Sequence, residues 1–174
     1  MINMESEMGT ITIVGLGYEE KQLTFEAAEL LKSGARVILH TGRCGCAEWL
    51  KKNGISFETL DYLYEECEDF DLHAARAAET VVAASKEENV VYGVFDVRDR
   101  SASEILKRTR ARVVAGPPAE GALTVYAQDA VKTLVAADWE NFHLNASEGV
   151  LIRELDSRAL ASEVKLKLMD CYPE

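Results

Sequence analysis

The sequence predicts an α/β domain in which a mostly parallel sheet is covered by helices on both faces. Short apolar runs rich in β-branched residues alternate along the chain with longer segments that carry apolar residues at helical spacing. Glycine marks several of the boundaries between these segments, as it does where a chain must turn. Because parallel strands need long crossover connections, usually helices, this alternation is typical of a parallel sheet between two helical layers.

The amino-terminal half of the chain supplies the first three expected strands and two expected helices. Three compact apolar runs are predicted to be strands: Thr10–Gly15, Arg36–His40 and Ser56–Leu60. The helices that connect them are predicted at Leu23–Leu31 and Ala47–Lys52. The chain therefore begins with two consecutive strand–helix–strand units.

The carboxyl-terminal half continues the alternation. The expected strands are Asn89–Phe95, Arg112–Ala115 and Gly149–Arg153. The expected helices are His73–Ala84, Ser101–Thr109, Gly121–Ala137 and Asp156–Met169. The apolar side of the last helix is predicted to carry Leu160, Val164, Leu166 and Leu168.

Helix ends carry recognisable signals. We expect Thr24 to cap the start of the first helix and Gly34 to follow its end, where glycine adopts a positive φ without strain. Ser101 is followed three residues later by Glu104, which is the spacing of a capping box.

Composition and charge restrict the class of protein. The 174 residues are 48% hydrophobic and 28% charged, as in a soluble globular domain, and their formal net charge is −11. This charge disfavours nucleic acid as a partner, because carboxylates repel a phosphate backbone. Neither a membrane-spanning run nor a basic secretory leader is evident, so we expect a cytoplasmic protein that does not enter a membrane. We predict one domain over residues 1–155, followed by a closing helix and the start of an interdomain linker over residues 156–174.

A ligand is expected at the edge of the sheet where the parallel strands end. In open α/β sheets, ligands lie outside the carboxyl ends of the strands, at a point where the connections diverge. The loops after residues 15, 40, 95 and 115 are therefore the candidate functional edge. Gly15-Leu16-Gly17 follows the first strand, but Glu20 stands where a dinucleotide fingerprint needs its third glycine, so we reject that motif.

The chain resembles the amino-terminal domain of the tetrapyrrole (corrin/porphyrin) methylase family, and within it the methylase-like domain fused to MazG-type nucleotide pyrophosphohydrolases. Four parts of the sequence carry the resemblance. They are Ile13-Val14-Gly15-Leu16-Gly17 with Leu23-Thr24 and 26–31, His40-Thr41-Gly42-Arg43 with Glu48-Trp49-Leu50, the stretch 57–65, and the closing segment 160–168 with Tyr172-Pro173.

The resemblance implies a fold, a cofactor and a set of binding residues. Members of the family have two α/β domains with S-adenosylmethionine in the cleft between them, and they methylate a tetrapyrrole-like small molecule. One wall of such a cleft would be formed here, and a cofactor would contact Gly15, Gly17, Gly93, Asp96, Val97 and Gly116. The family's Gly-Asp-Pro or Gly-His-Pro loop is replaced by Asp96-Val97-Arg98, and Tyr18-Glu19-Glu20 replaces its Pro-Gly-Asp. Both departures predict a methyltransferase domain that is incomplete or degenerate in catalysis.

Two other functions remain open at the level of the sequence. One is a non-catalytic regulatory or dimerisation module associated with a MazG-type pyrophosphohydrolase, and a homodimer is expected in either case. The other is a different small-molecule enzyme on the same sheet. No catalytic residue is assigned, and His40 is expected to line the site rather than to react. No metal is expected, because Cys44-Gly45-Cys46 has no second ligand pair at zinc-site spacing.

Overall fold

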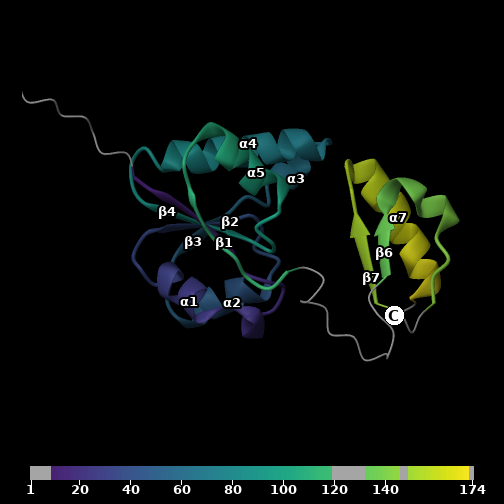
Figure 1. Ribbon diagram of the computed structural model, residues 1–174, viewed down its shortest axis with the longest axis horizontal. Helices are drawn as coiled ribbons and strands as arrows, with labels where there is room; N and C mark the ends of the chain where they lie inside the picture. Colours follow the sequence, from purple (N-terminus) through teal and green to yellow (C-terminus); the bar gives the residue numbers. More distant parts are fainter. Residues whose placement is uncertain (1–8, 119–131, 146–148, 173–174) are drawn as a thin grey trace, which may run out of the picture.

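The computed structural model of the chain describes residues 9–118, 132–145 and 149–172, and these form a parallel sheet with a smaller group of elements beside it (Figure 1). The sheet has five strands in the order β3-β2-β4-β1-β5, and every pairing is parallel. Its strands are β1 (Ile11–Gly15), β2 (Arg36–Leu39), β3 (Phe57–Thr59), β4 (Val90–Val94) and β5 (Arg112–Val114).

Helices cover both faces of this sheet. The short turn η1 (Glu20–Gln22) and the helices α1 (Phe25–Leu31) and α2 (Gly45–Lys52) belong to one side, whereas α3 (Leu63–Glu66), α4 (Phe70–Ala84) and α5 (Arg100–Arg108) belong to the other (Figure 1). The connections that run from β1 outward to β3 use one face, and those that return through β4 to β5 use the opposite face. Right-handed crossovers require this arrangement when the direction of progress reverses. The predicted fold class is confirmed.

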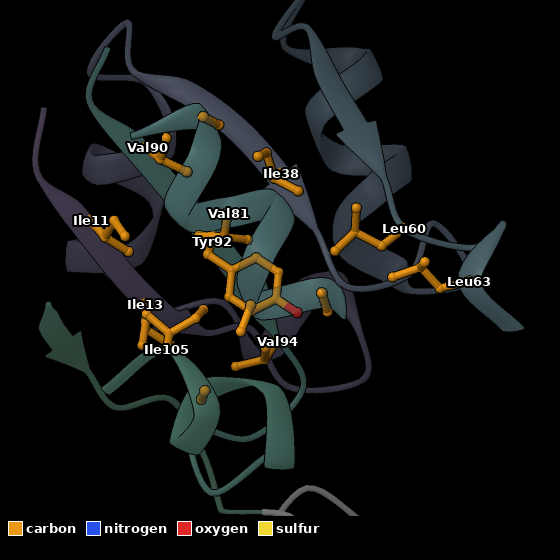
Figure 2. Packing of buried hydrophobic residues seen from close by; sticks show 14 residues of the cluster. Ile11, Ile13, Ile38, Leu60, Leu63, Val81, Val90, Tyr92, Val94 and Ile105 are labelled. Carbon is orange, nitrogen blue, oxygen red and sulfur yellow. The ribbon is translucent and has the colours of Figure 1, made fainter. Parts of the chain in front are cut away.

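The central strands β1, β2 and β4 bury both of their faces, which explains why they are continuous apolar runs in the sequence. Successive side chains on a strand point to opposite faces. Ile13 and Tyr92 therefore pack against α4 and α5, where Val81 and Ile105 meet them (Figure 2). Val14, the next residue on β1, lies in a second cluster with residues of α1 and α2.

The smaller group of elements corrects one expectation from the sequence. The strands β6 (Lys132–Val135) and β7 (Val150–Arg153) form a separate parallel pair, which packs with η2 (Ala136–Asn141) and α7 (Arg158–Cys171). The helix predicted over Gly121–Ala137 is therefore wrong from Lys132 onward, while its residues 121–131 lie outside the described part of the chain. The strand expected at Gly149–Arg153 exists, but it pairs with β6 and not with the large sheet.

Two of the expected helix-end signals are confirmed and one is corrected. The Thr24 hydroxyl accepts the Ala27 amide at 3.1 Å, and Gly34 has a φ of 84°. The start of α5 is capped by Asp99 and not by Ser101, because the Asp99 carboxylate accepts the Ser101 amide at 2.8 Å. On α7, Leu166 is 60% exposed, so this residue does not lie on the buried side.

Reciprocal contacts join the smaller group to the sheet. The Phe70 amide donates to the carbonyl of Asp156 at 3.1 Å, and the Arg158 amide donates to the carbonyl of Glu68 at 3.2 Å. The Arg100 guanidinium donates to Asp71 at 2.9 Å and also to Asp156. The first turns of α4 and α7 are therefore tied to each other.

Two expectations stay predictions. The first is the predicted domain boundary after residue 155. In the structure, α7 lies in one apolar cluster with η2, β6 and β7, which precede that boundary. Cytoplasmic location is the other: among the residues that the structure describes, none of the helices is long and apolar enough to cross a membrane.

Candidate functional site

The loops after β1 and β4 meet at the carboxyl edge of the sheet. The two strands are neighbours, and beyond their last paired residues the Leu16 amide donates to the Val94 carbonyl at 2.8 Å. The Gly17 amide then donates to the Phe95 carbonyl at 3.0 Å. From here β1 leads to α1 on one face and β4 leads to α5 on the other (Figure 1). This is the topological switch point at which open α/β sheets bind ligands.

A cavity of about 480 Å³ lies at this edge, within the range of about 300–1,000 Å³ that is usual for small-molecule sites. Its walls come from the loops after β1, β2 and β4, from α4, and from the segment around β7. Residues that line it include Tyr18, His40, Tyr64, His73, Asp96, Asp99, Arg100 and Glu154. Glu154 is the only described residue other than glycine with a positive φ, 60°, and such backbone strain is commonly found at functional sites.

The glycines named for cofactor contact are already required by the packing of the chain. A Cβ at Gly116 would lie 2.2 Å from the Gly15 carbonyl oxygen, and one at Gly15 would lie 2.5 Å from the Gly116 nitrogen. A Cβ at Gly93 would lie 2.7 Å from a methyl group of Leu16. Gly17 has a φ of 70°, which itself favours glycine. The role of these residues in cofactor binding stays a prediction, and none of the four lines the cavity.

The side chains of Asp96, Val97 and Arg98 fill the space beside the backbone of the loop that they form. The Arg98 guanidinium donates to the Asp96 carboxylate, with Nη2 at 2.6 Å from Oδ2 and Nε at 3.0 Å from Oδ1. Val97 packs against the core beneath α4 and α5, and its Cγ1 lies 3.3 Å from where a Cβ of Gly15 would be. The backbone approach that the resemblance implies for S-adenosylmethionine does not fit this loop. Of the six residues named for cofactor contact, Asp96 alone lines the cavity.

A hydrogen-bonded chain of four side chains joins two residues of the cavity lining, His40 and Asp99, through the core. His40 Nδ1 lies 2.7 Å from the Tyr92 hydroxyl, which lies 2.8 Å from Ser101 Oγ, and Ser101 Oγ donates to the Asp99 carboxylate. Burial raises the pKa of Tyr92 well above its usual range, with the Asp99 charge acting in the same direction. Tyr92 is therefore a neutral hydroxyl that can donate one hydrogen bond and accept another.

Four aromatic rings gather at the end of this chain formed by His40. The ring of His73 lies 5.0 Å from that of His40 and 4.4 Å from that of Tyr64, between centroids, and Phe70 stands 6.4 Å from His73. Burial, and then the neighbouring imidazole of His40, lowers the pKa of His73, although the Asp99 carboxylate opposes the shift. Burial raises the pKa of Tyr64 to about 12.

His73 carries an unsatisfied polar atom. The residue is 4% exposed, and its Nε2 has no hydrogen-bond partner among the described residues. A buried nitrogen without a partner costs free energy of about 1–3 kcal/mol. Its position in the lining of a cavity is the arrangement expected when a ligand supplies the missing partner.

Sequence reasoning found part of this site. It placed the ligand at the loops after residues 15, 40, 95 and 115 and expected His40 to line the site. The cavity is lined by His40 and by residues of the loops after residues 15 and 95, but residues 116–118 do not line it. It missed His73, Tyr64 and Asp99. A signal existed for His73, because this residue shares the buried face of α4 with Ala77 and Val81 at intervals of one helical turn.

Comparisons with known proteins find likenesses among solved structures only. No family model matches the chain, and no curated protein sequence matches it. Among solved structures, 34 chains match. One is a protein from Corynebacterium diphtheriae described as related to cobalamin synthesis (CobF). It is 18% identical over 90% of this chain and 76% of that chain, with a TM-score of 0.42. A likeness of this size carries no functional argument, and the α/β class rests on the strand order and pairing described above.

Proposed function

We propose that this chain is a tetrapyrrole methylase-like domain that has kept a ligand-binding edge and is degenerate in methyl transfer. The observation that carries the proposal is the cavity of about 480 Å³ at the point where the β1 and β4 loops meet. The residue resemblance to the methylase family points to the same edge of the sheet. A methyl donor is already activated, so a methyltransferase mainly positions donor and acceptor. Val97 and the Arg98–Asp96 ion pair occupy this loop, and we expect it to position a donor poorly through its backbone.

S-adenosylmethionine is the donor that the resemblance implies, with a tetrapyrrole-like acceptor. We expect the chain to bind S-adenosylmethionine weakly. The triple variant Asp96→Gly, Val97→His and Arg98→Pro should bind it about tenfold more tightly, a change of about 1.4 kcal/mol. The physical reason is the removal of a branched side chain and an ion pair from the approach to the backbone. Isothermal titration calorimetry with S-adenosylmethionine and its demethylated product measures both affinities.

The matched control for this titration is Arg110→Ala, which removes an exposed cation outside the cavity and should leave the affinity unchanged. Equal affinity of the parent chain and the triple variant would show that loop shape is not the defect. An absence of heat for both proteins at millimolar ligand would overturn the methylase assignment.

The second candidate is a non-catalytic regulatory or dimerisation module associated with a MazG-type pyrophosphohydrolase. Two observations favour it: the closed loop after β4, and two apolar side chains one turn apart on α7, Leu166 and Met169, which are 60% and 56% exposed. Exposed apolar side chains that lie together on a helix are a common feature of protein interfaces. A homodimer in solution is the simplest form of this candidate.

A further inference from the structure

The charges around the cavity leave one carboxylate without a cation. Arg98 is paired with Asp96, and Arg100 is paired with both Asp71 and Asp156. Among the described residues, the Asp99 carboxylate accepts only from the amide and the hydroxyl of Ser101, and it forms no ion pair. Arg153 and Glu154, which also line the cavity, carry opposite formal charges that sum to zero. The cavity therefore favours a cation over an anion, as does the formal net charge of −11.

The hydrogen-bond chain that begins at Asp99 fixes the tautomer of His40. An ionised carboxylate only accepts, so the Ser101 hydroxyl must donate to Asp99. Ser101 Oγ must then accept from the Tyr92 hydroxyl, and the Tyr92 oxygen must accept from His40 Nδ1. When His40 is neutral its proton is therefore on Nδ1, and Nε2 is left as an acceptor for the cavity that this residue lines.

The surroundings of this acceptor suit a small ammonium group. His73 contributes a second ring beside that of His40, and its Nε2 is buried without a partner among the described residues. Tyr64 and Phe70 add aromatic rings to the same lining, and aromatic faces attract cations. A carboxylate, an imidazole acceptor and aromatic rings together provide charge, hydrogen bonding and an apolar wall for one cationic ligand.

We propose that the cavity is a binding site for a small organic molecule with a protonated primary amine, whose ammonium group lies near Asp99 and donates a hydrogen bond to Nε2 of His40. The inference rests on the proposed function, because it names the ligand class of the same cavity. It assigns Asp99 and His40 to ligand binding and Tyr92 and Ser101 to positioning. A metal ion is the less favoured cation, since the described residues hold no group of three ligands that could bind one.

Nuclear magnetic resonance of the histidine side chains tests the proposal on the intact chain, which has three histidines. Long-range ¹H–¹⁵N spectra distinguish the tautomers, and we expect His40 to be protonated on Nδ1. A His40 that is protonated on Nε2 in the neutral state would overturn the proposal without the need for any variant. His143, which is exposed and does not line the cavity, is the internal reference.

The ligand probes are ethylammonium, tetramethylammonium and acetate at constant ionic strength. We expect ethylammonium to shift the His40 and His73 resonances saturably, with affinity in the millimolar range that so few atoms allow. Tetramethylammonium carries the same charge but no N–H donor, and it should bind at least several-fold more weakly. Acetate should cause no saturable shift. Equal effects of all three probes, or a saturable effect of acetate alone, would overturn the proposal.

The decisive variant is Asp99→Asn, which keeps an acceptor for the amide of Ser101 and so keeps the cap of α5. Loss of the charge should weaken ethylammonium binding about tenfold. Asp170→Asn is the matched control, because it removes one charge from an exposed position on α7 outside the cavity. An equal loss in both variants would mean that only the net charge matters, and the site would be rejected.

S-adenosylmethionine, which carries a primary ammonium, separates failure of this inference from failure of the proposed function. Saturable ethylammonium binding without binding of S-adenosylmethionine would remove the methylase assignment and leave the amine site. Binding of S-adenosylmethionine without a shift at His40 or His73 would remove the amine site and leave the methylase assignment.

Discussion

At the scale of single residues, His73 shows how burial sets chemistry. Its ring is enclosed by His40, Tyr64 and Phe70, and its pKa is lowered by burial and then by the adjacent imidazole. A charged His73 would therefore be placed next to a second imidazole in a site with little access to water. Asp99 reduces this penalty without cancelling it.

The lowered pKa of His73 predicts that the folded chain loses stability in mild acid. The pKa of this group is lower in the folded chain than its ordinary value of 6.5, so below that pH the unfolded chain binds more protons. The free energy of unfolding should therefore fall as the pH drops from 7 to 5, with a contribution from this residue of at most about 1.4 kcal/mol per pH unit. Urea unfolding at several pH values measures the slope, and His73→Gln should reduce it.

The control for the pH series is His143→Gln, which changes an exposed histidine and should keep the slope of the parent chain. A slope that is the same in His73→Gln as in the parent would contradict the assignment of this effect to His73.

At the scale of elements, strands buried on both faces and helices with a clear apolar side were predictable, because their patterns are local. Arg36–His40 and Ala47–Lys52 were placed within about two residues of β2 and α2, the usual uncertainty of helix ends. The segment Lys132–Val135 was not predictable in this way. It is a strand because it pairs with Val150–Arg153, and its four residues, none of them buried, lack the continuous buried apolar run that marks β4.

The cap of α1 supports a prediction at this scale. The Thr24 hydroxyl accepts the Ala27 amide, which would otherwise lack a partner in the first turn. Thr24→Ala should lower the free energy of unfolding by about 1 kcal/mol, the usual value for such a cap. Thr24→Ser keeps the hydroxyl and should lose much less. Thermal or urea unfolding of the three proteins makes the comparison, and equal stability of the alanine and serine variants would contradict the role of the hydroxyl.

At the scale of the whole molecule, the sequence predicts the fold class and the edge of the sheet at which the cavity lies. It does not predict which side chains meet there. Alternation of strands and helices implies the parallel sheet, and the sheet implies the edge at which a ligand lies. The side chains that meet there come from positions as distant as 40, 73 and 99 along the chain. Each was visible in the sequence, but only the packing of α4 and α5 on the sheet brings the three together.

The module candidate makes a prediction at this scale. If α7 is a dimer interface, light scattering should give twice the 19.2 kDa mass of one chain. Leu166→Glu with Met169→Glu should then restore the mass of one chain, because like charges would face each other across the two-fold axis. Glu163→Lys, an exposed change of charge on the same helix, is the control and should leave the dimer intact if it lies off the interface. A single-chain mass for the parent protein would argue against the module.

The reciprocal hydrogen bonds between the starts of α4 and α7 have a mechanical consequence. Each helix obtains a partner for its first turn from the segment that precedes the other helix, through the carbonyls of Asp156 and Glu68. Detaching the smaller group would leave the amides of Phe70 and Arg158 without these acceptors, so the starts of both helices would lose a partner together. The cavity beside this junction is lined both by Phe70 and His73 of α4 and by Glu154 and Leu155 just before α7, so a ligand bound there would contact both parts of the molecule.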